Sequence, residues 1–224
     1  MLLIENTETY GWEAAIRGMR NPLNSWAKSD TQFFPGAVPV IGQNDLKLMK
    51  QLGAVGNDHG KFLRMIGVSV DVTGPMYWWA EADTYKVGTV RNSCSKMHKL
   101  TAKEFTLDDF SWDQLLNTGM DLFTEESDNG LFCWNVQPIQ FLNDYIIPSL
   151  NECRNKYLET QDKAYWWQII QLLPASYNQR STLTLNYAVL KNIYHARKNH
   201  KLDCWHTFCE WIESLPYSEL ITGE

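Results

Sequence analysis

Residues 66–73 carry the clearest structural signal in the chain, because apolar residues alternate there with small or polar ones. The two sets are Ile66, Val68, Val70 and Val72, and Gly67, Ser69, Asp71 and Thr73. A period of two places all the branched side chains on one face of a β-strand. The pattern therefore predicts a half-buried strand that leads directly into Pro75.

A helix is predicted from Met76 to Lys86, followed by a polar loop. Proline suits the first position of a helix, where its missing N–H costs no hydrogen bond, and apolar or aromatic residues then follow at helical spacing. The periodicity breaks at Gly88, and the next residues are rich in hydroxyl, amide and guanidinium groups. Such a loop is either a polar connection that caps the next helix or a site that holds an anion or a sugar.

Length and composition predict one globular domain over 1–224, with a mainly helical C-terminal half from about residue 138. The apolar content is 44%, the charged content is 21%, and no stretch approaches the roughly 18 uninterrupted apolar residues of a membrane span. The first residues include an acid and lack a basic start, so no secretory signal is expected. We therefore expect a cytoplasmic protein without a membrane partner.

The net charge and the cysteine content indicate which ligands the chain can bind. A net charge of −6 disfavours broad binding to DNA or RNA, because that affinity comes mainly from neutralising phosphates. A small phosphate-bearing ligand needs only a local cluster of cations. The five cysteines are scattered without a C-x-x-C pair, which indicates reduced thiols, and the spacing of His195, His200 and His206 disfavours a metal site.

Ten tryptophans in one small chain are unusual, and they indicate a large core or a subunit interface, with some rings free to stack on a base. Neighbours such as Trp78 and Trp79 point to different faces of a helix, so we expect at most one of them in a given pocket.

Other helices are predicted from their periodicity and caps. The expected ranges are 10–20, 44–52 with Asn44 or Asp45 as the cap, 106–116, 139–158 with a kink or break at Pro148, and a helix that starts at Asp162. The segment from Leu23 to Gly42 is expected to be an extended loop.

The span from Pro75 to His98 resembles the signature region of the flavin-dependent thymidylate synthases (ThyX). In that family a strand, a proline and a helix lead into Arg-His-Arg, then a small residue and Ser, then Asn-Glu-x-Ser-x-Arg-Tyr. Here Thr84-Tyr85-Lys86 occupies the place of Arg-His-Arg, Thr89 that of the serine, and Asn92-Ser93-Cys94-Ser95-Lys96-Met97-His98 that of the last part. The positions of a second flavin element, Phe-Glu-His, hold Leu63, Arg64 and Met65.

A second part of the resemblance lies near the C-terminus. The family places Leu-Pro about a dozen residues before a helix of the type Asn-x-Arg-Ser-Leu-x-x-Phe-x-x-x-Arg. Leu173-Pro174 lies at that distance from Asn186, and Asn186, Leu190 and Arg197 fall in register, with Ala188 in place of the internal arginine. The arginine that corresponds to Arg197 helps the family to bind the pyrimidine nucleotide.

The resemblance implies an α/β (α+β) fold, with a central β-sheet flanked by long helices. It also implies a homo-oligomer, with a homotetramer as one form, because the family builds its sites between subunits. The ligand-binding residues that we predict from the loop chemistry and the resemblance are Tyr85, Lys86, Thr89, Arg91, Asn92, Ser93, Ser95, Asn186 and Arg197; no catalytic residue and no metal ligand is predicted.

Two functional hypotheses follow. The first is a protein that binds or sequesters a nucleotide or nucleotide-derived signal without a cofactor, because the flavin contacts of the family are replaced. The chain also resembles small proteins of phages of Gram-positive bacteria, where sequestration would serve counter-defence in the host cytoplasm. The second is an FAD-dependent enzyme that methylates or hydroxymethylates a pyrimidine deoxynucleotide, with a folate carbon donor and a nicotinamide reductant. A third possibility is a protein that binds another protein through its aromatic surface.

Overall fold

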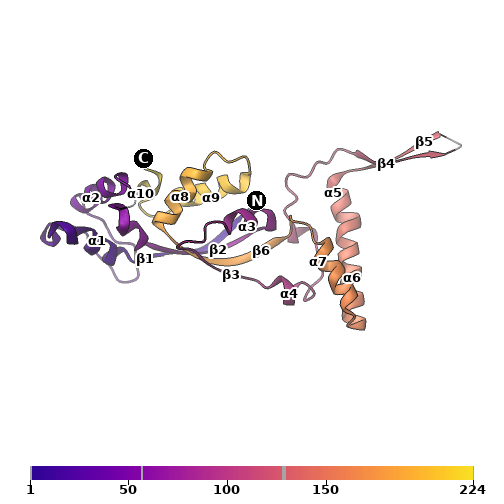
Figure 1. Cartoon of the computed structure of the whole chain (residues 1–224), viewed down its shortest axis with the longest axis horizontal. Coiled ribbons are helices and arrows are strands. Elements are labelled where there is room, and N and C mark those ends of the chain that lie inside the picture. Colours follow the sequence, from indigo (N-terminus) through magenta and orange to yellow (C-terminus); the bar gives the residue numbers. More distant parts are fainter. Residues whose placement is uncertain (1, 57, 128–129, 224) are drawn as a thin grey trace. The chain divides into compact units, whose positions relative to one another are not determined.

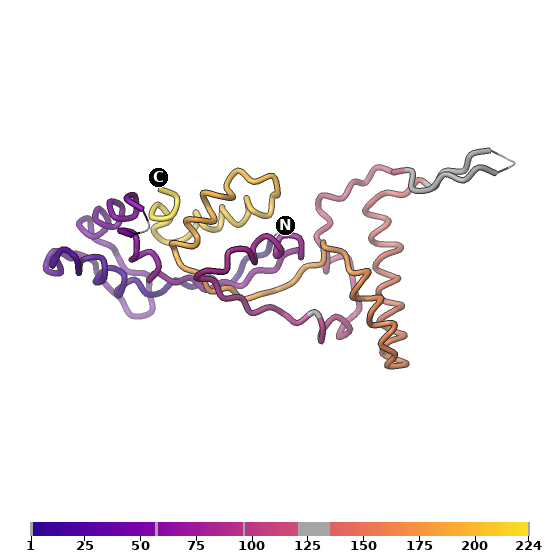
Figure 2. Tube along the Cα trace, viewed as in Figure 1, coloured from indigo at the N-terminus to yellow at the C-terminus, as the bar shows by residue number. Residues whose placement is uncertain are grey.

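The computed structural model describes residues 2–56, 58–127 and 130–223, and for 96, 121–127 and 130–134 it describes the backbone alone (Figure 2). By its internal contacts the chain forms two compact units. Unit 1 comprises 1–73, 78–93 and 180–224, and unit 2 comprises 74–77 and 94–179. Two compact units can belong to one domain, so the single domain over 1–224 stays a prediction.

Unit 1 is built on a four-stranded sheet with the order β1-β2-β6-β3 (Figure 1). The strands are β1 (Leu3–Tyr10), β2 (Gly67–Pro75), β3 (Val90–Ser93) and β6 (Asn178–Asn186). The pairs β1–β2 and β3–β6 are antiparallel. The helices of the unit are α1 (Trp12–Arg20), α2 (Gln43–Ala54), α3 (Met76–Ala82), α8 (Tyr187–Arg197), α9 (Asp203–Glu213) and α10 (Glu219–Thr222), with short 3-10 turns at Asn21–Leu23, Trp26–Lys28 and Gly60–Arg64.

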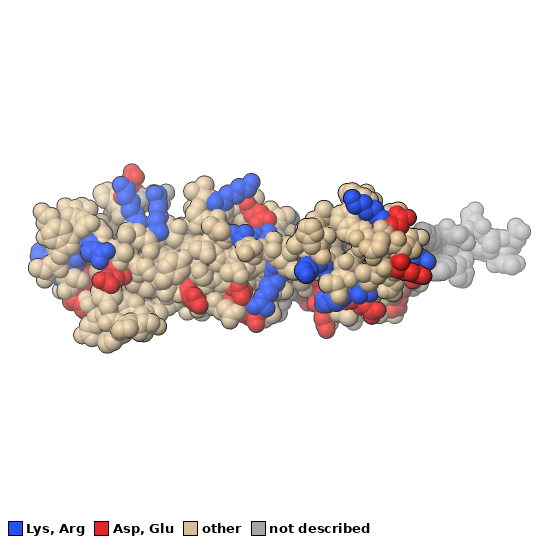
Figure 3. Space-filling view, turned by 90° about the horizontal axis from the view of Figure 1, so that it is seen from below, with Lys and Arg blue, Asp and Glu red and all other residues tan. Residues whose placement is uncertain are grey.

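One face of this sheet is covered and the other is polar. Val68, Val70 and Val72 of β2 are buried, as the alternating pattern predicts, and α3, α8 and α9 lie on the same side of the sheet in Figure 1. The opposite side chains include Asp71, which is held by Thr182 and Arg180 from β6. The face seen in Figure 3 carries acidic and basic side chains interspersed with one another.

Unit 2 has its own apolar core, formed by Leu100, Phe105, Phe110, Leu142, Ile147, Leu150 and Ile169. Its elements are α4 (Lys96–Lys99), a 3-10 turn at Leu107–Asp109, the antiparallel hairpin β4 (Met120–Ser127) and β5 (Gly130–Val136), α5 (Pro138–Gln140), a π-helical stretch at Phe141–Ile146, α6 (Ile147–Thr160) and α7 (Lys163–Leu172). Helices α6 and α7 lie side by side (Figure 1). No helix among the described residues combines the length and the apolar character that crossing a membrane requires.

Several predicted boundaries differ from the structure. The helix after Pro75 ends at Ala82, because the Thr84 hydroxyl and N–H both bond to the Glu81 carbonyl and turn the chain. The predicted helix over 106–116 is only the turn Leu107–Asp109, closed by a capping box of Thr106 and Asp109. Helical structure continues through Pro148, since the wider π-helical turn before it accommodates the missing N–H.

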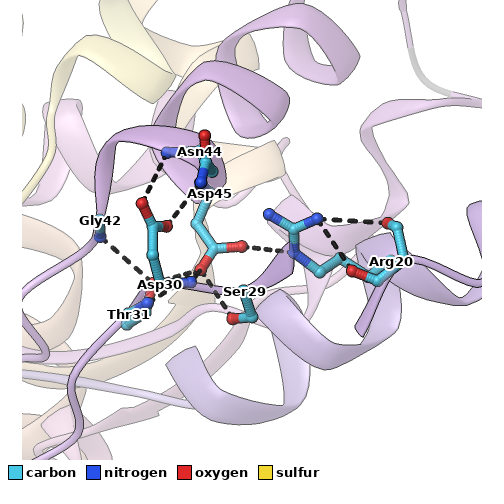
Figure 4. Close-up of polar contacts among 8 residues, drawn as sticks. Arg20, Ser29, Asp30, Thr31, Gly42, Asn44 and Asp45 are labelled. Atoms are coloured by element: carbon cyan, nitrogen blue, oxygen red, sulfur yellow. Dashed lines mark hydrogen bonds and ion pairs between the residues drawn. The ribbon is translucent and has the colours of Figure 1, made fainter. Parts of the chain in front are cut away.

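The start of α2 is fixed by a network that the sequence alone does not show (Figure 4). The Asp30 carboxylate, not Asn44 or Asp45, accepts the first N–H groups of the helix. Asp45 instead turns inward, where Arg20 Nε lies 2.6 Å from its Oδ1 and the hydroxyls of Ser29 and Thr31 each lie 2.7 Å from its Oδ2. This buried ion pair joins α1, α2 and the loop between them.

Replacing Asp45 with Asn is expected to lower the free energy of unfolding by about 3–5 kcal/mol at neutral pH, because Arg20 would stay buried without its counter-charge. Burial opposes ionisation of Asp45, but hydrogen bonds from Thr31, Ser29 and Arg20 outweigh it and hold the pKa of the carboxyl below its ordinary value. Wild type therefore loses this stabilisation as the pH falls from about 4 through the folded pKa.

Urea unfolding of both proteins between neutral and acidic pH measures this effect, and the difference between them should shrink at acidic pH. Glu13→Gln is a matched control, because its pair with Arg17 is exposed and worth at most about 1 kcal/mol. A difference between wild type and Asp45→Asn that is the same at every pH would contradict the account.

Candidate functional site

A cavity of about 410 Å³ lies within unit 1, between α3, the turn after it, β3, β6, α8 and α9. We call it the aromatic cavity, because five aromatic side chains line it: Trp78, Trp79, Tyr85, Trp205 and Phe208. Its polar lining residues are Asp83, Lys86, Thr89 and Arg91. A volume of this size suits a drug-sized ligand such as a mononucleotide.

The aromatic wall is rigid because its rings pack on one another in the core. The Trp78 ring centroid lies 4.6 Å from that of Trp79, 5.2 Å from that of Trp205 and 5.5 Å from that of Phe208. Trp78 and Trp205 are fully buried. Both Trp78 and Trp79 line the cavity, so the expectation that at most one of the pair could do so is wrong: two adjacent rings on a short helix flank the same space.

Glu81 of α3 holds the α8 and α9 side of the cavity together. Its Oε2 accepts hydrogen bonds from Arg197 Nη1 and from Trp205 Nε1, both at 2.9 Å, and His200 Nε2 lies 3.6 Å from the same oxygen. Arg197 Nε donates to the Tyr85 hydroxyl at 2.8 Å, and its guanidinium lies 4.8 Å from the Trp205 ring centroid. Arg197 thereby orients two aromatic side chains of the cavity.

Arg91 organises the opposite rim. Its Nη1 binds both carboxylate oxygens of Asp83, at 2.8 and 2.6 Å, and its Nε donates to the Ser181 hydroxyl at 2.9 Å. The guanidinium carbon lies 3.7 Å from the Trp79 ring centroid, a cation–π contact. The positive charge of Arg91 is therefore already balanced within the chain.

Lys86 differs from the two arginines, since no carboxylate pairs with its ammonium group among the described residues. It is exposed at the cavity, next to Gly88, whose φ of +78° is in the left-handed region that glycine tolerates. A Cβ at Gly88 would also lie 3.1 Å from Asn186 and Val189. Glycine is thus needed where the chain turns to bring Thr89 to the cavity.

The structure brings together some of the predicted ligand residues and separates others. Tyr85, Lys86, Thr89 and Arg91 line the aromatic cavity, and Arg197 contacts it through Tyr85 and Trp205. The other predicted residues do not line this cavity. Asn92 and Ser93 lie exposed on edge strand β3. Asn186 caps α8 by accepting a hydrogen bond from Val189 N at 3.0 Å, and Ser95 caps α4 in unit 2 by accepting one from His98 N. Ligand binding by any of these residues stays a prediction.

Sequence reasoning missed Glu81, Asp83 and Trp205, which complete the cavity. Glu81 is the only acid in helix α3, beside two tryptophans, and that isolation is the one signal that could have marked it. Among the described residues, no group of three or more His, Cys, Asp or Glu side chains could hold a metal ion. Burial raises the pKa of the Cys209 thiol in α9 to about 11, with Glu213 and Glu210 adding to the shift, which disfavours a thiolate there.

No protein-family model matches the chain, and no curated protein matches it in sequence. The fold of the chain does match those of solved structures. A structure of ThyX from Helicobacter pylori with FAD and dUMP has a TM-score of 0.67 at 16% identity, and the match covers 100% of this chain and 98% of that one. The fold is that of the flavin-dependent thymidylate synthases. The UMP/dUMP methylase PolB from Streptomyces cacaoi, bound with 5-Br dUMP, has a TM-score of 0.59 at 12% identity, with 100% and 94% covered.

The ThyX-like mixed helix-and-sheet fold predicted from the signature spans is therefore confirmed. The expectation that the chain uses no cofactor is corrected, because structures of this fold bound to FAD and dUMP point toward FAD. Two residues that line the aromatic cavity, Trp78 and Thr89, each carry a buried polar atom, Nε1 and Oγ1, without a hydrogen-bond partner in the described chain, and the heteroatoms of one bound ring system would suit such groups. FAD as a whole is larger than the drug-sized ligands that such a volume suits.

A double-mutant cycle tests whether Arg197 organises the cavity through Glu81. Glu81→Ala and Arg197→Ala are each expected to lower the free energy of unfolding by about 1–2 kcal/mol, and the double variant by about 1 kcal/mol less than the sum. Urea unfolding supplies these values, and Glu13→Ala with Arg17→Ala, an exposed pair, serves as the control cycle. Additive effects at Glu81 and Arg197 would contradict the assigned contact.

Proposed function

We propose that the chain binds a pyrimidine nucleotide with its base in the aromatic cavity and, together with FAD, transfers a one-carbon group to that base. The observation that carries the proposal is that one cavity combines aromatic rings with Lys86, whose ammonium group has no carboxylate partner in the part of the chain that the structure describes. The fold is shared with proteins whose structures hold FAD, dUMP or a UMP analogue, and this supports the same ligand class.

Stacking supplies the affinity for the base in this proposal. Contact between a base and an aromatic side chain is worth about 1–3 kcal/mol, and rings already fixed by packing lose little freedom on binding. Tyr85 and Trp205 are held by Arg197 and Glu81, and Trp79 is held under Arg91. Tyr85 is half-buried and would present its face to a planar ring, while the buried rings of Trp79 and Trp205 behind it keep that wall fixed.

Lys86 would supply the contact with the nucleotide phosphate. Arg91 and Arg197 each already bind a carboxylate, so a phosphate would have to break an ion pair to reach them. The ammonium group of Lys86 is exposed and can form a charge-assisted hydrogen bond without that cost. The proposal therefore assigns phosphate binding to Lys86 and a positioning role to Arg197.

FAD, when bound, would supply the redox chemistry of such a transfer. Within this chain Thr84, Tyr85 and Lys86 occupy the places of the family's Arg-His-Arg, and the Tyr85 hydroxyl is engaged with Arg197. Contacts to FAD would then depend on Lys86, on the residues around the cavity and on other subunits. A homo-oligomer, with a homotetramer as one form, is part of this proposal.

A second candidate is nucleotide binding without turnover. The observation that favours it is the same replacement of Arg-His-Arg, which removes cationic groups that the family uses. Sequestration of a nucleotide signal, a phage origin, counter-defence and a cytoplasmic location belong to this candidate.

Titration calorimetry with dUMP and with 2′-deoxyuridine tests the role of Lys86. Lys86→Gln is expected to weaken dUMP binding about tenfold, the loss of one charge-assisted hydrogen bond, and to leave binding of the uncharged nucleoside unchanged. Lys47→Gln, an exposed lysine on α2, is the matched control. Equal weakening of both ligands would show that Lys86 does not bind the phosphate, and no binding of either ligand would contradict the proposed cavity.

Turnover separates the two candidates. The protein is incubated with dUMP, FAD, a methylenefolate donor and a nicotinamide reductant, and the nucleotide is analysed by mass spectrometry. A methylated or hydroxymethylated product supports the enzyme. Binding of dUMP without any product supports nucleotide binding alone.

A further inference from the structure

A loop of unit 1 exposes several apolar side chains close together. Between Asp30 and Asp45 the sequence has no charged residue, although 21% of the whole chain is charged. We call residues 32–40 the apolar loop. Clustered apolar groups on a protein surface mark sites of interaction with other molecules. The exposed apolar side chains of the loop are Phe33, Phe34, Val38 and Val40.

The base of the apolar loop is held in one conformation by hydrogen bonds. The backbones of Gln32 and Val40 exchange two of them, at 2.9 and 3.0 Å. The Tyr217 hydroxyl accepts from the Ile41 N–H at 2.9 Å and donates to the Pro39 carbonyl at 2.8 Å. A loop that is already fixed loses little conformational freedom when it binds a partner.

The tip of the apolar loop is a tight turn over residues 34–37. The Ala37 N–H donates to the Phe34 carbonyl at 3.2 Å, and Pro35 and Gly36 are the two central residues. Gly36 has a φ of +70°, as the third position of a type II turn requires. A Cβ at Gly36 would meet no atom within 4 Å, so the tip projects into open space. The turn thus presents Phe34 at the end of a fixed projection.

Unit 2 has a surface of matching chemistry, an open cavity of about 430 Å³. We call it the apolar cavity, because no charged residue is found among the described residues that line it, and Ser176 is the one polar residue of that set. Three of its apolar lining residues are themselves exposed: Leu115, Met120 and Phe141. A cavity of about 150 Å³ can bind benzene, so this volume admits a phenyl ring with room for its neighbours.

We propose that the apolar loop of one chain inserts Phe34 into the apolar cavity of a second copy of the chain. Neither surface carries a charge, so the contact desolvates no ionised group. Interfaces between proteins are commonly centred on aromatic side chains that fill apolar pockets. The inference goes beyond the proposed function, on which it rests only in that two copies of the chain must meet.

The size of the contact determines what it can contribute. A buried aromatic side chain removes about 150–250 Å² from water, whereas stable interfaces bury about 1,200–2,000 Å² in total. One inserted loop is therefore only part of an interface between copies. Removing Phe34 is expected to weaken the association of the copies and to leave the fold of each chain intact, because the side chain is half exposed.

Sedimentation velocity of the full chain over a range of concentrations tests the proposal. Wild type is expected to form an oligomer. Phe34→Ser and Leu115→Ser are each expected to raise the subunit dissociation constant about tenfold or more, because each change removes one side of the contact. Val55→Ser is the matched control, since Val55 is 67% exposed outside both surfaces, and it should associate as wild type does. Urea unfolding curves check that each variant is folded.

Disulfide crosslinking tests whether the two surfaces meet between chains. Phe34→Cys is placed in one chain and Leu115→Cys in a second chain with a different tag. The co-expressed pair is oxidised with copper phenanthroline, and the linked peptides are identified by mass spectrometry. The proposal predicts a disulfide between positions 34 and 115 that joins the two tagged chains. The pair Phe34→Cys and Val55→Cys is the control and should not crosslink.

Three results would overturn the proposal. A wild-type chain that stays monomeric would have no second copy to bind. An oligomer that Phe34→Ser leaves unchanged would show that other surfaces join the copies. Binding of the monomer to phosphatidylcholine vesicles, lost in Phe34→Ser, would assign the apolar loop to a lipid surface. Nucleotide binding at the aromatic cavity is measured separately, so failure here leaves the proposed nucleotide site standing.

Discussion

The aromatic cavity depends on the hydrogen bonds that the Glu81 carboxylate accepts. It accepts hydrogen bonds from Arg197 of α8 and Trp205 of α9, so one short helix fixes two longer ones. Arg197 then fixes the Tyr85 hydroxyl. Without this carboxylate the arginine would lose its counter-charge, and Tyr85 and Trp205 would lose the hydrogen bonds that orient them, whereas the packing of Trp78 on Trp79 and Phe208 would remain.

Ion pairing also decides which cations of unit 1 can bind a ligand. Arg20, Arg91, Arg180 and Arg197 are all matched with acids, and an external anion would have to compete with each acid. Lys86, at the aromatic cavity, has no such partner among the described residues. The distribution of paired and unpaired cations is therefore a better indication of anion sites than the number of cations.

The sequence predicts the centre of the fold and part of the site. The alternation over 66–73 and the proline after it identify β2 and the start of α3, because those signals are local. Strands β1 and β3 were missed, since both are edge strands with mostly exposed side chains and therefore lack an alternating pattern. Glu81 was missed because its partners Arg197 and Trp205 are 116 and 124 residues away. The resemblance to ThyX located Arg197, but the role that its contacts support is to position Tyr85 and Trp205.

Photocrosslinking with 5-bromo-dUMP tests the central claim most directly, because the brominated base reacts with aromatic side chains that stack on it. The purified chain is irradiated with the nucleotide, digested, and the modified residues are identified by mass spectrometry, with excess dUMP as competitor. The account predicts an adduct on Tyr85, the half-buried ring of the aromatic cavity, that dUMP suppresses. Competable adducts found only on residues outside the aromatic cavity would contradict it.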